Sequence, residues 1–212
     1  MKGLMEESLL RWTWNGEEQE PFLCSAEDGE ALLRGFLLTQ CGADDDRVRS
    51  IARDGDAWRV ETEGSPAPRA GLAERLDRTA PVSSDFRTGT EELEKLCDLA
   101  MARDPRRAGL HTVVLSDGTK TVAGRDVGRH NALDKAVGKA LQAGMDPGRS
   151  AMCTSGRISL EVLAKAAAAG IPVIATRKAV GSLAALYGER LGIAVCRLGE
   201  ETGCFGAAWR VR

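Results

Sequence analysis

The sequence predicts an α/β fold, in which a three-layer sandwich carries a small N-terminal α+β lobe. From His111 onward, strand-like runs alternate with helical patterns whose apolar residues recur every three or four positions. Such alternation requires right-handed crossovers, which place helices on both faces of a sheet. Upstream, short strand-like runs surround a single helical pattern. We therefore expect a lobe over 1–65, a linker over 66–90 and a core over 91–212.

The N-terminal lobe is expected to contain two strand pairs and one helix. Arg11 to Trp14 and Glu20 to Cys24 form the first pair, joined at an Asn15-Gly16 turn. The helix starts at Ser25, has an acidic first turn and ends at Gly42. The second strand pair is expected at Val48 to Ile51 and Trp58 to Thr62.

The stretch from Glu63 to Gly89 is expected to be the least ordered part of the chain. It contains Gly64-Ser65-Pro66-Ala67-Pro68, which interrupts every regular pattern. A helix follows from Glu91 to Met101. Its apolar face includes Cys97, which favours a packing role for that thiol.

The core is expected to begin with a hairpin at an Asp117-Gly118 turn and to continue as alternating helices and strands. Gly170 and Gly192 occupy positions typical of helix C-caps. The expected strands are 112–115, 119–123, 150–153, 171–176 and 193–198, and the expected helices are 132–141, 160–169 and 178–190.

The decapeptide Asp-Val-Gly-Arg-His-Asn-Ala-Leu-Asp-Lys, residues 126–135, lies where a strand gives way to a helix. A helix N-terminus presents free backbone amides and the positive end of the helix dipole. Gly128 to Asn131 should therefore seat a phosphate or another anion, assisted by Arg129, His130 and Lys135.

An alternative reading of the decapeptide is purely structural. Asp126, Asn131 and Asp134 could cap the helix, while the cations remain solvated. A cap accounts for one or two polar residues and not for this density of different ones, so we favour a functional site.

A second polar turn, Thr154-Ser155-Gly156-Arg157, also joins a strand to a helix. Arg157 could hold an oxyanion through two hydrogen bonds, although an ordinary turn with Ser159 and Glu161 at the helix start is the alternative. Ligands of such sheets bind beyond the carboxyl ends of the strands. We expect one anion-binding pocket built from Gly128, Arg129, His130, Asn131, Lys135, Ser155, Gly156 and Arg157.

Composition and motifs exclude several classes of protein. The net charge of −2 and the pI of about 5.8 give no global basic field for nucleic acid. No run approaches the roughly 18 apolar residues that span a bilayer, and residues 1–11 lack the apolar segment of a signal peptide. We therefore expect a cytoplasmic protein without membrane contact. No Gly-Lys-Ser/Thr follows Gly124 and Gly128, and no Gly-x-Ser-x-Gly occurs, so neither a P-loop nor a serine hydrolase is indicated.

The six cysteines contain no Cys-x-x-Cys and no regular ladder, which predicts reduced thiols. Cys153 is a weak candidate for reactivity, because a helix N-terminus and Arg157 lie close in sequence; a packed cysteine is the favoured alternative. Cys204 is expected to be more exposed, but it has no partner nearby in sequence.

The decapeptide with its continuation to Leu141, the run from Ser155 to Glu161, Lys165, and Ala169 to Val173 together resemble the FdhD family. Asn15-Gly16 and Arg34-Gly35-Phe36-Leu37-Leu38 are similar to the N-terminal region of that family. These are formate dehydrogenase accessory proteins, regarded as sulfur carriers for the molybdenum cofactor. The resemblance implies a cytidine-deaminase-like core and a homodimer.

The resemblance further implies binding of the molybdenum bis(guanine dinucleotide) pterin, or of a guanine nucleotide, and transfer of sulfur to it. A cysteine desulfurase and formate dehydrogenase are the implied partners. No zinc is expected, because the His-x-Glu and Pro-Cys-x-x-Cys of zinc deaminases are missing. His111 is expected only to start a strand.

Two departures from the family concern its chemistry. The family carries a Cys-x-x-Cys in the loop that corresponds to about Asp77 to Gly89, and this loop holds no cysteine here. The family's last strand ends in Gly-Phe-x-Arg, whereas here Arg197 is followed by Glu200 and Glu201. Whether the chain is a sulfurtransferase therefore stays open. The alternatives are a non-catalytic cofactor-binding chaperone and an unrelated enzyme on the same scaffold.

Overall fold

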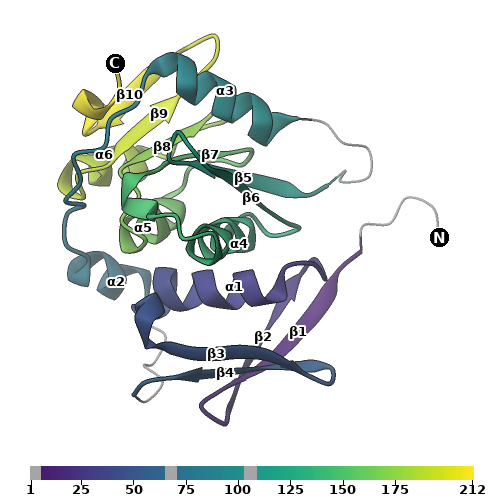
Figure 1. The fold of residues 1–212 in the computed structure, drawn as a ribbon. Helices are drawn as coiled ribbons and strands as arrows, with labels where there is room; N and C mark the ends of the chain where they lie inside the picture. Colours follow the sequence, from purple (N-terminus) through teal and green to yellow (C-terminus); the bar gives the residue numbers. More distant parts are fainter. Residues whose placement is uncertain (1–5, 65–70, 103–108) are drawn as a thin grey trace.

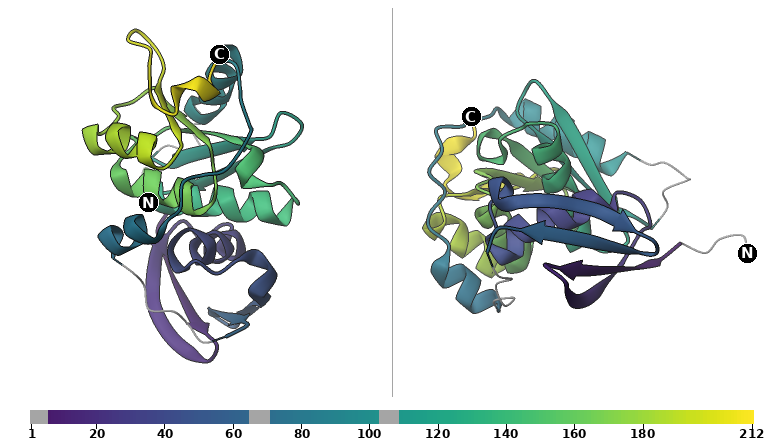
Figure 2. Two further views of the ribbon diagram at one scale, coloured as in Figure 1. Left: turned by 90° about the vertical axis from the view of Figure 1, so that its left-hand side faces the viewer. Right: turned by 60° about the horizontal axis from the view of Figure 1, so that its bottom comes forward.

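A computed structural model describes residues 6–64, 71–102 and 109–212, and it confirms a mixed α/β fold. Figure 1 shows two sheets separated by helices. Helix α1 lies between the small N-terminal sheet and helix α4, which in turn covers one face of the large sheet (Figures 1 and 2). The two sheets are therefore joined by the packing of α1 against α4.

The small sheet has the strand order β2-β1-β4-β3, with β1 and β4 parallel and the other neighbours antiparallel. The turn at Asn15-Gly16 is confirmed, with positive φ at both residues. The expected helix starts later than Ser25 and changes to a π-helix before Gly42. The elements are β1 (Ser8–Trp14), β2 (Glu17–Cys24), α1 (Gly29–Phe36), the π-helix Leu37–Cys41, the 3₁₀ turn Asp45–Arg47, β3 (Val48–Asp54) and β4 (Ala57–Thr62).

The connection between the sheets contains a helix that the sequence reading missed, α2 (Leu72–Arg78). Leu72 and Leu76 lie one helical turn apart and pack against the core below the large sheet. This apolar pair fixes a short helix in a stretch expected to be irregular. The prolines at 66 and 68 lie outside the described residues.

The large sheet has the strand order β10-β9-β8-β7-β5-β6. Strands β7, β8 and β9 are parallel, and β5 is antiparallel to both β6 and β7. The hairpin with Gly118 at its turn is confirmed, whereas strand β10 at the sheet edge was not predicted. The strands are β5 (His111–Ser116), β6 (Thr121–Asp126), β7 (Ala151–Thr154), β8 (Val173–Thr176), β9 (Ala194–Arg197) and β10 (Gly203–Gly206).

Helices cover both faces of the large sheet, as the alternating pattern predicts. Helix α3 packs on one face in an apolar cluster that includes Leu93 and Cys97. Helices α4, α5 and α6 pack on the other face around Leu133, Leu163 and Ala184. These helices are α3 (Thr90–Met101), α4 (Arg129–Gln142), α5 (Leu160–Ala168) and α6 (Ser182–Arg190), and 3₁₀ turns lie at Pro147–Arg149 and Ala208–Arg210.

Glycines let α1 and α4 approach more closely than side chains would allow. A Cβ atom added at Gly35 would lie 1.9 Å from the backbone oxygen of Asp134, and one added at Gly138 would lie 2.0 Å from that of Ala31. Both distances are far below any real Cβ contact. The junction between the small sheet and the core therefore depends on the absence of side chains at these two positions.

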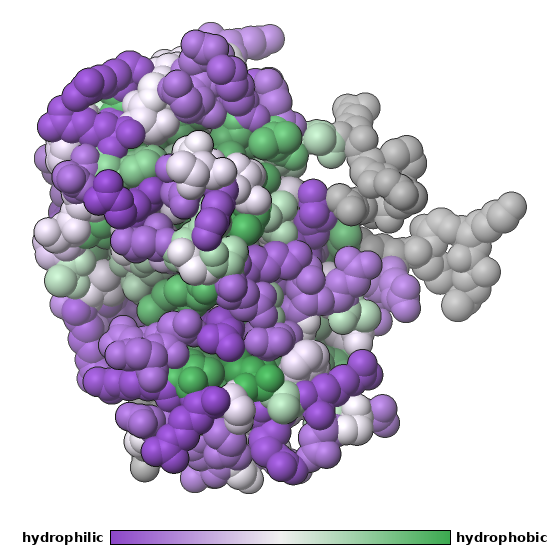
Figure 3. Space-filling view, viewed as in Figure 1, coloured by the Kyte–Doolittle hydropathy of each residue, from purple (hydrophilic) through white to green (hydrophobic). Residues whose placement is uncertain are grey.

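The surface is mainly hydrophilic on the face drawn in Figure 3, and its hydrophobic residues form small separate patches. No helix among the described residues is long and apolar enough to cross a membrane. Within the described part of the chain, the exposed large hydrophobic side chains are Leu9, Leu23, Leu99, Leu183, Leu186, Phe205 and Trp209.

Candidate anion-binding site

The carboxyl ends of four strands gather at one edge of the large sheet. Strands β7, β8 and β9 point in one direction, and β6 points the same way because it is separated from β7 by antiparallel β5. For the same reason, the first residue of β5, His111, lies at this edge. We call this end of the sheet the carboxyl edge. It comprises His111 at the start of β5 and the residues at or just after the ends of the other strands, which are Arg129, Thr154 to Arg157, and Thr176 to Lys178.

His111, Arg129 and Gly156 lie against one another at the carboxyl edge. A Cβ atom added at Gly156 would lie 3.5 Å from His111 Nδ1 and 3.6 Å from Arg129 Cβ. The start of β5 is held to this turn, because the backbone amide of Thr112 donates to Ser155 Oγ at 2.8 Å. Two of the predicted site residues, Arg129 and Gly156, are thus brought together, and His111 joins them.

Hydroxyl groups fix the backbone of the two turns that follow β7 and β8. Thr154 Oγ1 accepts from the amide of Gly156 at 3.1 Å, and Thr176 Oγ1 donates to the carbonyl of Gly156 at 2.7 Å. Thr176 Oγ1 also accepts from the amide of Lys178 at 3.0 Å. The turns are therefore rigid supports for the side chains of Arg157, Arg177 and Lys178.

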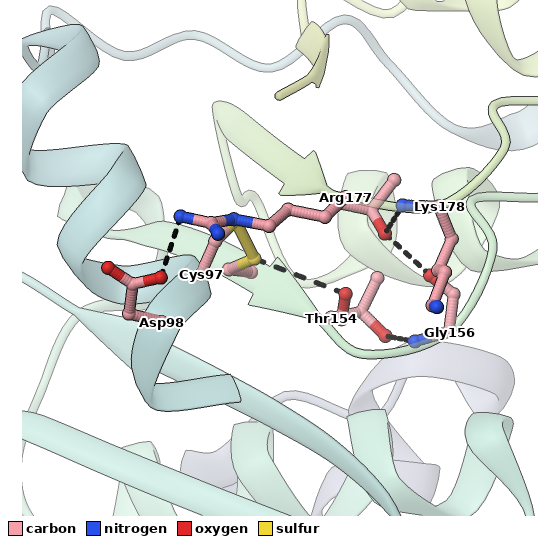
Figure 4. Close-up of a disulfide and its surroundings, with 8 residues drawn as sticks. Cys97, Asp98, Thr154, Gly156, Arg177 and Lys178 are labelled. Carbon is pink, nitrogen blue, oxygen red and sulfur yellow. Dashed lines mark hydrogen bonds and ion pairs between the residues drawn. A yellow bond between two sulfur atoms is a disulfide. The ribbon is translucent and has the colours of Figure 1, made fainter. Parts of the chain in front are cut away.

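Besides Arg129, four cationic side chains come from this edge, and only some of them have a carboxylate nearby. Figure 4 shows Arg177 reaching from the end of β8, past Cys97, to Asp98 on α3, where the ion pair measures 2.6 Å. Arg157 and Lys178 are exposed and form no ion pair with a described residue. Arg197 lies at the same edge, but it pairs with Glu201 at 2.9 Å. The carboxyl edge therefore keeps an excess of positive charge.

The N-terminus of α4 adds backbone donors to this charge. Its N-cap residue, Gly128, supplies no side chain to the first turn. The amides of an uncapped first turn remain available to an anion. Arg129 contributes a buried Nε without a hydrogen-bond partner among the described residues. The helix amides and this Nε are both donors of the kind that bind an oxyanion.

The pKa of His111 lies below its usual value of 6.5, mainly because burial disfavours the charged ring and secondly because the Arg129 cation is near. Asp126 opposes this effect and does not reverse it. This lowered pKa favours the uncharged form of the ring at neutral pH. A bound anion would act in the opposite direction and raise the pKa of His111.

Two predicted site residues, Asn131 and Lys135, are placed elsewhere by the structure. Lys135 is fully buried, lies 2.7 Å from Asp126 Oδ2 and donates to Ser25 Oγ at 2.9 Å. Asn131 Nδ2 donates to the carbonyl of Leu23 at 2.8 Å and to Asp126 Oδ1 at 3.1 Å. These side chains join the N-terminal lobe to α4. In this structure Lys135 does not reach the carboxyl edge.

His130 lines a separate cavity of about 430 Å³. Its Nε2 lies 3.4 Å from Glu161 Oε2, and burial is the main cause that lowers the pKa of the ring. The cavity lies between the small sheet and the starts of α4 and α5. It is lined by Trp12, Trp14, Gln19, Glu20, Pro21, Phe22, Leu23, Phe36, Gln40, Cys41, His130, Asn131 and Glu161. The eight residues predicted to form one pocket are thus divided among the edge, the core and this cavity.

The expectation of reduced thiols is wrong for four of the six cysteines. Cys97 on α3 forms a disulfide with Cys153 on β7, and Cys196 forms one with Cys204. The weak candidate Cys153 is fully buried, so it presents no thiolate at the carboxyl edge. Helix packing and strand register bring these residues together, and neither can be read from cysteine spacing.

The sequence reading missed three residues at this edge, His111, Arg177 and Lys178. A signal for Arg177 and Lys178 was present in the sequence, because they directly follow the strand expected at 171–176. Arg157 follows the strand expected at 150–153 in a similar way. His111 carried no such signal, because it precedes its strand and reaches the edge only through the antiparallel direction of β5.

The fold defines a class of α/β proteins with a mixed six-stranded sheet, and comparisons with known proteins identify the family. The model of the FdhD/NarQ family matches residues 69–203. The chain belongs to the FdhD/NarQ family, as the sequence resemblance indicated.

Similar proteins support this assignment. The chain is 33% identical over 170 residues to a sulfur carrier protein FdhD from Nocardia farcinica, which covers 79% of this chain and 54% of the relative. It is 44% identical over 100 residues to a protein of the same name from Anaeromyxobacter sp. (strain K), covering 43% and 35%. The chain thus spans about a third to about half the length of these curated relatives.

A solved structure shares the fold. A crystal structure described as that of a formate dehydrogenase accessory protein from Desulfotalea psychrophila matches with a TM-score of 0.83 and 25% sequence identity. The match covers 98% of this chain and 90% of the other. It therefore includes both the small sheet and the large one.

Proposed function

We propose that this protein is a formate dehydrogenase accessory protein that binds the molybdenum cofactor through its guanine dinucleotide at the carboxyl edge. The observation that carries the proposal is that Arg129 and His111 lie against Gly156, the residue before Arg157, where the uncapped N-terminus of α4 begins. Charged donors and helix amides suit a diphosphate. The names of the relatives support an accessory role and sulfur carriage. The proposal adds a cysteine desulfurase as the sulfur donor, formate dehydrogenase as the recipient and a homodimer as the assembly.

The cofactor is the cargo in this proposal, and the residues at the edge fit its phosphate groups. Arg129 has a buried Nε that lacks a partner among the described side chains, and a phosphate oxygen would supply one. Arg157 is exposed and could close over the same group. The neutral ring of His111 can donate or accept one hydrogen bond.

A second candidate is a cofactor-binding chaperone without sulfur chemistry. It is favoured by the absence of cysteine from residues 77–89 and by the burial of Cys153 in a disulfide. Both candidates require the same nucleotide site, so a binding experiment tests what they share.

Arg129→Ala and Arg157→Ala should each weaken the binding of guanosine diphosphate about 10- to 100-fold, because each removes a hydrogen bond to a charged group worth about 1.5–3 kcal/mol. Isothermal titration calorimetry measures the change. Arg149→Ala is the matched control, because Arg149 is exposed just before β7, at the opposite edge of the sheet. Equal affinity in all four proteins, or an equal loss in the control, would contradict the proposal.

A further inference from the structure

Two cysteines that are distant from the missing Cys-x-x-Cys form a pair beside the carboxyl edge. Cys196 on β9 and Cys204 on β10 are direct antiparallel partners, with Cα atoms 4.2 Å apart. Directly opposed side chains on antiparallel strands lie within reach of each other. The pair therefore has the proximity that two thiols need to exchange sulfur, although eight positions separate them in sequence.

The two cysteines differ in exposure. Strand β10 is one of the two edge strands of the sheet, and Cys204 on it is partly exposed. Cys196 lies on the inner strand and is 1% exposed. A donor can therefore approach Cys204, with Cys196 held behind it as a second thiol. Arg197, the next residue along β9, is the last residue of that strand, so the pair lies near the same end of the sheet as the proposed nucleotide site, with β8 between them.

The other cysteines do not offer this combination. Cys97 and Cys153 are both fully buried. Cys24 is buried, and burial is the main cause that raises the pKa of its thiol. Cys41 is partly exposed, but it is not in a disulfide. Cys196 and Cys204 thus form the cysteine pair that has one partly exposed member.

We propose that Cys204 is the sulfur-carrying thiol of this protein and that Cys196 is the thiol that releases the sulfur; this inference rests on the proposed accessory function. In the loading step, the Cys204 thiolate attacks the outer sulfur of a donor persulfide. A bond forms between Cys204 Sγ and that sulfur, and the donor leaves as a thiolate.

In the release step, the Cys196 thiolate attacks Cys204 Sγ and expels hydrosulfide. The sulfane sulfur takes up two electrons, and the two cysteines lose them as they form the Cys196–Cys204 disulfide. This disulfide is the state seen in the structure. A dithiol reductant returns the pair to two thiols and is itself oxidised to a disulfide.

The experiment loads the protein with glutathione persulfide after reduction by dithiothreitol and removal of the reductant. Intact-protein mass spectrometry follows sulfur gain, and released hydrosulfide is measured in the same samples. Wild-type protein should release hydrosulfide and recover the Cys196–Cys204 disulfide. Cys196→Ser should retain one added sulfur, mapped to Cys204, and lose hydrosulfide release.

Cys204→Ser should lose both the added sulfur at this site and the release, whereas the control Cys41→Ser should behave as wild type. Alkylation of Cys204 in the reduced wild-type protein gives the same test without a substitution, should a variant fail to fold. Release by Cys204→Ser at the wild-type rate, or sulfur mapped to Cys41 instead, would overturn the proposal.

Guanosine diphosphate binding, measured on the same samples, separates the two proposals. Normal nucleotide binding without sulfur on Cys204 overturns the cysteine assignment and leaves the nucleotide site standing. Sulfur transfer through Cys204 without nucleotide binding supports the cysteine assignment and contradicts the proposed cofactor site.

Discussion

Asp134→Asn is expected to lower the free energy of unfolding by about 3–5 kcal/mol, because it leaves the cation of Lys165 buried without its counter-charge. Lys165 Nζ lies 2.5 Å from Asp134 Oδ2, and both side chains are about 1% exposed. Thr39 Oγ1 donates to the other carboxylate oxygen at 2.6 Å. Burial already lowers the pKa of Lys165, and removal of the carboxylate removes the main opposing influence. Urea denaturation measures the change.

A surface pair provides the control for this substitution. Asp54 pairs with Arg59, and more than half of each side chain is exposed. Asp54→Asn should change the free energy of unfolding by less than about 1 kcal/mol. Replacing both members of the buried pair, in Asp134→Leu with Lys165→Met, should recover most of the lost stability. Equal effects of Asp134→Asn and Asp54→Asn would show that the buried pair is not required.

Gly35→Ala is expected to destabilise the protein by about 3 kcal/mol, at the upper end of the usual cost of overpacking. Its methyl group would lie 1.9 Å from the backbone oxygen of Asp134, and backbone cannot move aside as a flexible side chain can. Helices α1 and α4 would have to separate. The loss should appear as a lower melting temperature and a lower urea midpoint.

Gly71→Ala is the matched control for Gly35→Ala. Gly71 has a φ of −63°, and a Cβ atom there would meet nothing within 4 Å. Its replacement should change stability by no more than about 0.5 kcal/mol. If Gly35→Ala were as stable as Gly71→Ala, the close helix contact would not hold in solution.

Much of the fold follows from local patterns that the sequence displays openly. The Asn15-Gly16 and Asp117-Gly118 turns fix two hairpins, and the apolar periodicity after Gly128 fixes α4. Helix α2 was missed because its apolar signal is a single pair, Leu72 and Leu76, next to residues that break regular structure.

The candidate site was predicted less completely than the fold. The decapeptide correctly drew attention to the start of α4, but sequence cannot tell which of its polar residues turn inward. Lys135 turns toward Asp126 and Ser25, while Arg129 turns to the edge, although both are cations on the same helix. That division depends on where the N-terminal lobe docks.

Pairings between distant residues were also beyond the sequence. Cys204 had no visible partner because strand β10 was not predicted, and its register with Cys196 depends on that strand. Likewise, His111 lies at the site only because β5 runs antiparallel to β7. The positions of both residues depend on the pairing of distant strands, which residue type alone does not reveal.

The central claim is that a guanine nucleotide binds at the carboxyl edge, and the two histidines of the chain report on it directly. His111 lies at the edge, whereas His130 faces the cavity lined by Trp12 and Phe22. Nuclear magnetic resonance titration of the imidazole signals, with and without guanosine diphosphate, gives the pKa of each ring. His111→Gln assigns the two signals.

Saturating guanosine diphosphate is expected to shift the His111 signal and to raise the pKa of that ring from its lowered value, because a nearby phosphate stabilises the charged ring. The His130 signal should change less, since that ring lines the separate cavity beside Glu161. A shift confined to His130, or no change at either ring while the nucleotide is bound, would contradict a nucleotide site at the carboxyl edge.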